Sequence, residues 1–128
     1  MAKMTSDLQL DERLHTQCVT PELVQYIADK IAKTVNPQKI ILFGSWARNE
    51  ATEYSDVDLF IIHDGEMSNR EMYRRIARLF WGRLFGIDLI VRTPADVELN
   101  LAARNPFYTR HILREGRVLY ERTNQAAR

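Results

Sequence analysis

Hydrophobic residues recur every three or four positions between Thr20 and Asn36, and this period predicts an amphipathic helix. Thr20 is suited to cap the amino end of that helix, and Pro21 fits its first turn. Asn36 followed by a proline favours its end. Residues 1–19 show no firm period, so we expect an arm or a short helix there.

Short apolar runs elsewhere along the chain predict buried strands. They occupy residues 39–43, 56–62 and 87–91, and a shorter run at 117–120 is a candidate fourth strand. Asp88 interrupts the third run at a position where an apolar residue is expected. A carboxylate buried there would need an ion pair, hydrogen bonds or a metal ion.

Further helix signals lie between and after these strands. Residues 46–50 fit a short helix, and Ser68 with Glu71 matches a capping box. The helix that this box opens is expected to bury one face as far as Leu84 and to end before Gly86. Two later helices are expected to begin at Thr93-Pro94 and at Asn105-Pro106, the second ending at Gly116.

The order of these elements predicts an α+β fold, with a small mixed β-sheet covered by helices mainly on one face. We expect one domain at residues 20–120, preceded by an N-terminal arm at 1–19 and followed by a polar tail at 121–128. No apolar run approaches the roughly 20 residues that span a membrane, and no signal-peptide core is visible. A cytoplasmic protein is therefore expected.

Composition and charge narrow the choice of function. Cys18 is the only cysteine among 128 residues, which excludes an internal disulfide and a cysteine-based zinc site. Residues 1–69 carry four lysines and two arginines against eleven acidic residues, a balance of −5. Residues 70–128 carry twelve arginines against six acidic residues, a balance of +6. This arginine-rich half is either a set of solvated helix faces or a surface for an acidic protein, RNA or a triphosphate.

The first candidate for chemistry is Gly44-Ser45, placed where the first strand turns into the next segment. Glycine lets the backbone approach a ligand closely, and N–H groups at a helix start favour anions. The Ser45 hydroxyl would add one more donor to a phosphate oxygen. The same dipeptide also occurs in ordinary turns, so by itself it does not define a site.

The second candidate is the group of acidic residues Asp56, Asp58 and Asp88. Asp56 and Asp58 would project from the same face of a strand, with Cβ atoms about 7 Å apart. Such a pair can reach two divalent cations about 3.5–4 Å apart. Asp88 would lie beside them and accept the proton of an attacking hydroxyl. Asp56 could instead cap its loop, and Asp88 could pair with an arginine.

Gly44-Ser45, ten further residues, Asp56-Val57-Asp58 and the later Asp88 form one pattern. It resembles the nucleotidyltransferase superfamily with the DNA polymerase β-type fold. Within that superfamily the chain is similar to the minimal nucleotidyltransferases (MNT), the antitoxins of HEPN–MNT toxin–antitoxin pairs. The resemblance covers about residues 20–120. Asn49 departs from it, because the family usually has glycine there, although asparagine tolerates left-handed backbone angles.

The resemblance implies an enzyme that takes ATP with two Mg²⁺ ions, transfers AMP to a hydroxyl and releases pyrophosphate. Gly44 and Ser45 would hold the β- and γ-phosphates. Asp56 and Asp58 would ligate the metal ions, and Asp88 would ligate the catalytic ion and help deprotonate the acceptor.

Arg48 would either contact phosphate or brace the turn.

The family's partner is an all-helical HEPN RNase toxin, which the antitoxin neutralises by attaching AMP to a tyrosine (AMPylation). Larger relatives add domains that bind their acceptor, so we expect this chain's acceptor to bind a surface shared with a second protein. Two alternatives stay open, a small-molecule (antibiotic-type) nucleotidyltransferase and a non-catalytic toxin-binding module. Direct nucleic-acid binding is not favoured, because the arginine-rich half lacks an aromatic stacking motif.

Overall fold

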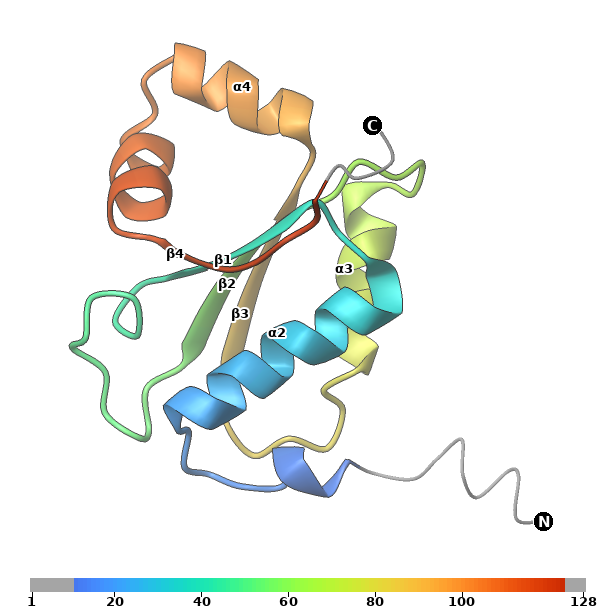
Figure 1. The fold of residues 1–128 in the computed structure, drawn as a ribbon, viewed down its shortest axis with the longest axis vertical. Coiled ribbons are helices and arrows are strands. Elements are labelled where there is room, and N and C mark those ends of the chain that lie inside the picture. Colours follow the sequence, from blue (N-terminus) through green and yellow to red (C-terminus); the bar gives the residue numbers. More distant parts are fainter. Residues whose placement is uncertain (1–10, 124–128) are drawn as a thin grey trace.

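A computed structural model of the chain describes residues 11–123, so residues 1–10 of the predicted arm and 124–128 of the predicted tail lie outside the described residues. Four strands form one mixed sheet in the order β3-β2-β1-β4 (Figure 1). Strand β1 runs antiparallel to β2 and β4, whereas β2 and β3 run parallel. The strands are β1 (Lys39–Phe43), β2 (Val57–Ile62), β3 (Ile87–Arg92) and β4 (Arg117–Glu121).

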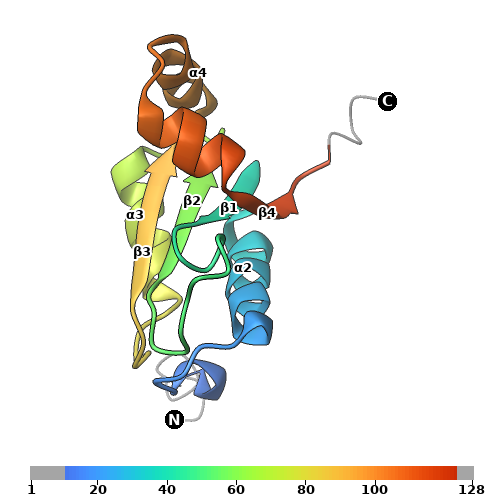
Figure 2. The same ribbon diagram turned by 90° about the vertical axis from the view of Figure 1, so that its left-hand side faces the viewer.

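Two helices, α2 (Pro21–Val35) and α3 (Asn69–Arg78), cover one face of the sheet (Figures 1 and 2). The alternation of side chains along the strands sends one set of apolar residues to these helices. Ile40, Leu59 and Ile61 are fully buried there, together with Ile27 of α2 and Ile76 of α3. This larger core confirms the predicted α+β fold, with a mixed sheet covered by helices mainly on one face.

The opposite face carries a smaller core beneath α4 (Pro94–Ala102) and η2 (Phe107–Arg114), a single π-helical segment. Aromatic rings join η2 to the sheet. The Phe43 and Phe107 ring centroids lie 5.4 Å apart, and those of Phe60 and Tyr108 lie 5.5 Å apart, both with edge-to-face geometry. Figure 2 shows η2 crossing one end of this face, while the loop between β1 and β2 occupies the other end.

Local capping signals place the starts of α2 and α3 and the end of α2 where the sequence predicted them. The Thr20 hydroxyl accepts a hydrogen bond from the Leu23 amide at 3.1 Å. Ser68 and Glu71 form the complete capping box at the start of α3. Asn36 ends α2 in a left-handed conformation with φ of 45°, which asparagine accepts more readily than most residues.

Two helix predictions were wrong. Residues 45–49 form hydrogen-bonded turns instead of a helix. Helix α3 ends at Arg78, and the chain then turns through Gly82, whose φ of 88° no helix can contain. The apolar period that continued to Leu84 therefore belongs to an irregular segment, where Leu84 is 49% exposed instead of buried.

The chain segments at the two ends of the predicted domain also contribute to the structure. A short 3₁₀ turn, η1 (Glu12–Leu14), precedes α2, and Leu14 and Val19 are buried in the larger core. At the other end β4 extends to Glu121. Among residues 11–123 no helix is both long enough and apolar enough to cross a bilayer.

Candidate functional site

Two of the three predicted acidic residues lie directly beside each other on neighbouring strands. Asp58 of β2 and Asp88 of β3 are register partners in the parallel pair. Because side chains alternate along a strand, both point to the face that carries Phe60 and η2. Asp56 precedes β2 by one residue, at the same end of the sheet. The carboxylates therefore lie at the end of this face that η2 leaves uncovered (Figure 2).

The sequence suggested that the Asp88 side chain is buried, but the structure shows otherwise. It is exposed, because β3 is an edge strand and its end extends beyond the smaller core. The apolar residues around it in sequence, Ile87 and Leu89, point to the other face and pack against the larger core. The Asp88 carboxylate therefore reaches water, and it needs no buried counter-ion.

Gly44 brings the backbone of the loop after β1 against Asp58. Its φ is +75°, and a Cβ atom built there would stand 2.1 Å from the Asp58 Oδ2 atom. Only glycine combines this backbone angle with so close an approach. The approach of Gly44 to a phosphate stays a prediction from the sequence, and the structure shows that Gly44 makes room for a carboxylate.

Gly86 makes the same kind of room for Asp56, which was not predicted from the sequence. A Cβ atom at Gly86 would lie 2.1 Å from the Asp56 Oδ1 atom. The Gly86 carbonyl also accepts a hydrogen bond from the Val57 amide at 2.9 Å, which fixes the start of β2 beside it. In the sequence, Gly86 was interpreted as the end of a helix. Only the pairing of β2 with β3 shows that Gly86 faces Asp56.

The carboxylates interact electrostatically, and the clearest effect falls on Asp58. Its pKa is raised from the usual 3.8 to about 6. Partial burial is the largest cause, followed by a side-chain hydrogen bond with Asp88 and by the negative charges of Asp88 and Asp56. Arg48 opposes the rise. The contribution of Asp88 and Asp56 to this raised pKa shows that negative charge is concentrated here, which favours a cation.

The turn after β1 offers backbone donors beside these carboxylates. The Ala47 and Arg48 amides donate to the Gly44 carbonyl, at 3.1 and 3.2 Å. Within the described part of the chain the Ser45 and Trp46 amides make no such bond. Asn49 closes the turn with a φ of 60°, so asparagine does supply the left-handed angle at this position. The turn therefore presents two amide donors and the Ser45 hydroxyl, without the helix that was expected to follow.

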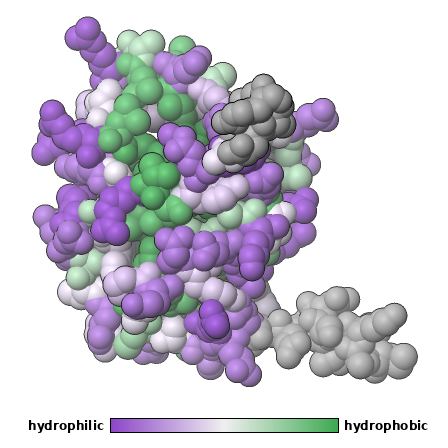
Figure 3. All heavy atoms as spheres, in the orientation of Figure 1, coloured by the Kyte–Doolittle hydropathy of each residue, from purple (hydrophilic) through white to green (hydrophobic). Residues whose placement is uncertain are grey.

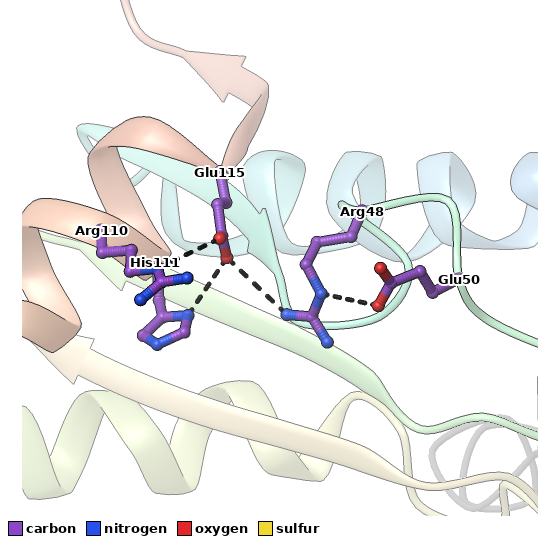
Figure 4. A network of polar contacts seen from close by, with 5 residues as sticks. All are labelled: Arg48, Glu50, Arg110, His111 and Glu115. Atoms are coloured by element: carbon purple, nitrogen blue, oxygen red, sulfur yellow. Dashed lines mark hydrogen bonds and ion pairs between the residues drawn. The ribbon is translucent and has the colours of Figure 1, made fainter.

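Arg48 is held by carboxylates from two directions (Figure 4). Its Nε atom lies 2.9 Å from Glu50 Oε1, and its Nη1 atom lies 3.8 Å from Glu115 Oε1. Glu115, at the end of η2, also contacts Arg110 at 3.6 Å and His111 at 3.1 Å. These contacts link the turn after β1 to η2, which favours the bracing function for Arg48.

Replacing Arg48 with methionine separates the two functions expected for this residue. If Arg48 braces the turn, Arg48→Met lowers the melting temperature by less than about 3 °C, because exposed ion pairs contribute little. We expect the KM for ATP to change by less than about threefold. Calorimetry and steady-state kinetics measure the two quantities. A tenfold higher KM at unchanged melting temperature would instead assign Arg48 to the phosphates.

The chemistry of the donor set fits Mg²⁺, which prefers carboxylate oxygens. Asp56, Asp58 and Asp88 supply those oxygens, and their mutual repulsion is what a divalent cation would relieve. In their present arrangement, however, no three carboxylate, imidazole or thiol groups within residues 11–123 are positioned to hold a metal ion. The fit therefore rests on donor type and charge.

Two of the three carboxylates lie on the open surface of the protein. Asp56 and Asp88 are exposed, and Asp58 is half-buried. A cavity of about 320 Å³ lies elsewhere, beside the start of α2, where Arg13, Cys18 and Tyr26 are among its lining residues. None of the candidate site residues lines that cavity, so we do not connect the cavity with the chemistry of the carboxylates.

Comparisons with known proteins identify the family. Residues 25–125 match the polymerase beta, nucleotidyltransferase family. Two proteins of Methanocaldococcus jannaschii, each described as a putative protein adenylyltransferase, are 38% identical over 91 residues and 37% identical over 84 residues. These matches cover 66% and 65% of this chain, and the chain spans 59% of the length of the first relative and 78% of the second.

A solved structure extends the comparison to the fold. The crystal structure of a putative nucleotidyltransferase from Sulfolobus solfataricus aligns with a TM-score of 0.54 at 19% identity, covering 79% of each chain. The mixed sheet and these matches define a domain of the nucleotidyltransferase class. The chain belongs to the polymerase beta, nucleotidyltransferase family, which confirms the resemblance to the nucleotidyltransferase superfamily seen in the sequence.

Proposed function

We propose that the protein is an adenylyltransferase that moves AMP from ATP to a tyrosine hydroxyl of a partner protein, and that the partner is a toxin of the HEPN RNase class. The observation that carries this proposal is the placement of Asp58 and Asp88 side by side in register, with Asp56 and the Gly44 turn against them. The relatives described as protein adenylyltransferases support the choice of a protein acceptor.

The reaction assigned to the site is an in-line displacement at the α-phosphorus of ATP. A bond forms from the acceptor oxygen to that phosphorus, and the bond to the bridging oxygen of the β-phosphate breaks, so pyrophosphate leaves. The hydroxyl proton passes to the exposed carboxylate of Asp88. The Ser45 and Trp46 amides and the Ser45 hydroxyl hold the outer phosphates. Positioning and charge neutralisation are most of what such a transfer requires.

In this proposal Asp56 and Asp58 would hold two Mg²⁺ ions, with Asp88 as a further ligand. When bound, the ions would neutralise the charge of the phosphates and of the leaving pyrophosphate. The glycines at positions 44 and 86 leave the carboxylates of Asp58 and Asp56 in place for this task. The pKa of Asp58 is raised mainly by burial and in addition by the nearby charges of Asp88 and Asp56, and a bound cation would offset these charges.

The openness of the site favours a macromolecular acceptor over a small molecule. Small ligands usually bind in concave pockets that cover most of their surface. Asp56 and Asp88 instead lie on an exposed end of the sheet. A protein that presents a tyrosine from its own surface can reach an open site of this kind, and its bulk would exclude water from the reacting groups.

The proposal is tested by incubating the purified protein with ATP labelled at the α-phosphate, Mg²⁺ and the protein encoded by the neighbouring gene. We expect label on a tyrosine of the neighbour, located by mass spectrometry. The double variant Asp56→Asn/Asp58→Asn should lower the labelling rate by at least about 100-fold while remaining folded by circular dichroism.

The same experiment discriminates the alternatives. A folded wild-type protein that leaves no label on the neighbour would contradict the proposed transfer. Label found only on an aminoglycoside added as a competing acceptor would favour the antibiotic-type enzyme. If the double variant protects cells from the neighbouring protein as well as the wild type does, binding alone neutralises the toxin and catalysis is dispensable.

A further inference from the structure

Large apolar side chains are exposed together on the α4 and η2 side of the molecule. Leu99 of α4, Leu113 of η2 and Val118 of β4 are 71%, 57% and 53% exposed. Single exposed leucines are common on protein surfaces, but continuous apolar patches mark binding sites. Figure 3 shows a continuous hydrophobic band that runs over α4 and η2 towards the sheet. We call the surface of Leu99, Leu113 and Val118 the apolar band.

The apolar band has an ordered floor. Val97, Leu101 and Phe107 are partly buried beneath it and pack against the smaller core. The Phe107 ring contacts Phe43 of β1 with edge-to-face geometry. The band is therefore attached to the sheet through packed side chains, and a partner that covered it would meet a preformed surface.

Positive charge borders the apolar band. Residues 103–117 carry four arginines and one acidic residue, Glu115. Arg104 and Arg114 form no ion pair in the described part of the chain, and Arg110 is exposed beside them. Arg117 instead points to the α2 face of the sheet, where it donates to Asn49. Glu98 is the exposed acidic residue on α4. Two copies of the chain that met through this surface would bring their arginines together, so a partner with acidic residues around an apolar patch fits better.

The η2 part of the apolar band lies on the same face of the sheet as the candidate site, whereas α4 follows the other end of β3 (Figure 2). Helix η2 sits on the face of the sheet to which Asp58 and Asp88 point, with the Phe43 ring between them, because Phe43 is the register partner of Asp58. Glu115 at the end of η2 reaches Arg48 in the turn of the site (Figure 4). A protein bound to η2 and extended along this face would therefore reach the exposed carboxylates.

From these observations we infer that the apolar band is the docking surface for the acceptor protein, which presents apolar side chains bordered by aspartate and glutamate. The inference rests on the adenylyltransferase function proposed above, and it names where the protein substrate binds. Docking at η2 positions the acceptor hydroxyl over Asp58 and Asp88, so the band provides substrate recognition that the open site lacks.

The test compares substitutions of exposed side chains on opposite faces of the sheet. The variant Leu99→Asp/Leu113→Asp places negative charge in the apolar band, and Tyr73→Asp changes a 45% exposed side chain on α3, behind the sheet. Calorimetry without ATP measures binding of the purified protein encoded by the neighbouring gene. We expect the band variant to weaken this binding at least tenfold and Tyr73→Asp to change it less than twofold. Arg110→Glu/Arg114→Glu should also weaken binding, with a reduced salt dependence.

Other outcomes overturn the inference or separate it from the proposed function. Equal binding by the wild type and a folded band variant, or no binding by the wild type, would exclude docking at the band. A wild-type dimer in sedimentation that the band variant converts to a monomer would make the band a self-association surface and would also exclude it. Band-dependent binding without transfer of label would retain the docking surface and refute the adenylyltransferase.

Discussion

Replacing Asp58 with asparagine is expected to reduce nucleotidyl transfer by at least about 100-fold and to raise the melting temperature of the metal-free protein at pH 7.5. The first effect follows because the variant loses a carboxylate of the proposed metal site. The second follows because burial, together with the neighbouring carboxylates of Asp88 and Asp56, raises the pKa of Asp58 to about 6. Its charge at pH 7.5 therefore opposes folding, and asparagine removes that charge at nearly the same size.

The stabilisation of Asp58→Asn should depend on pH in a defined direction. The carboxyl has a pKa of about 6 in the folded protein and an ordinary value of 3.8. Between these values the folded state binds more protons than the unfolded state, so stability falls as pH rises. Asp58→Asn has no titrating carboxyl at this position, so its stability does not fall with pH for this reason. Its advantage in melting temperature should be small near pH 4, grow up to about pH 6 and stay constant at higher pH.

Scanning fluorimetry in the presence of a chelator, from pH 4 to 8, measures this difference. Glu50→Gln is a suitable control, because Glu50 is an acidic residue of the same loop region that pairs with Arg48 and not with the three carboxylates. Its melting temperature should not exceed that of the wild type. A lower melting temperature for Asp58→Asn at pH 7.5 would show that the Asp58 carboxylate stabilises the fold, and would contradict a net repulsion among the three carboxylates.

The second large effect is expected for the two glycines that face the carboxylates. The Cβ atom of an alanine at position 86 would stand 2.1 Å from the Asp56 Oδ1 atom and would force this carboxylate to move. An alanine at position 44 would displace the Asp58 carboxylate in the same way. The displaced groups are ends of side chains, so the fold can adapt while the site loses its arrangement. We expect each variant to lose about 100-fold or more in transfer rate, since small misplacements at a reacting centre have effects of this size.

The two glycine variants should differ in stability. Gly86→Ala should keep nearly the wild-type melting temperature, whereas Gly44→Ala also places a side chain at a φ of +75°, which costs about 1–2 kcal/mol. Gly65→Ala is the matched control, because no atom lies within 4 Å of the added methyl group. Denaturation and labelling assays on all three proteins measure this. A fully active Gly86→Ala would refute the assignment of Asp56 to the site.

Elements with local signals could be predicted from the sequence. Thr20 and the Ser68–Glu71 box act within one helical turn, and the strand runs were recognised because they are short and apolar. The prediction of a helix as far as Leu84 was wrong because it relied on the apolar period alone. An apolar period cannot show that Gly82 turns the chain out of the helix. The prediction of a short helix at residues 46–50 was also wrong, because these residues carry no strong helix signal and form turns instead.

The site was only partly predictable, because its contacts join distant parts of the chain. The spacing of Asp56 and Asp58 indicated a shared face, but the sequence left open whether Asp88 lies beside them or pairs with an arginine. The physical basis for the position of Asp88 beside Asp58 is the parallel register of β2 and β3, which the intervening α3 makes possible. The apolar setting of Asp88 in sequence suggested burial, whereas an edge strand leaves one of its faces open. The function of Gly86 had no sequence signal.

The wide helical turn of η2 constrains how this region can vary. Its hydrogen bonds span five residues, as between the Glu115 amide and the Arg110 carbonyl at 2.9 Å. Loss of one residue between Asn105 and Gly116 would let the segment close as an α-helix, in which each residue is rotated by about 100° from the previous one. Every side chain after the deletion would then point in a new direction, and Glu115 could no longer face Arg48 while Leu113 faces outward. Length changes in this segment would therefore redirect side chains on both of its sides and should not be treated as neutral loop variation.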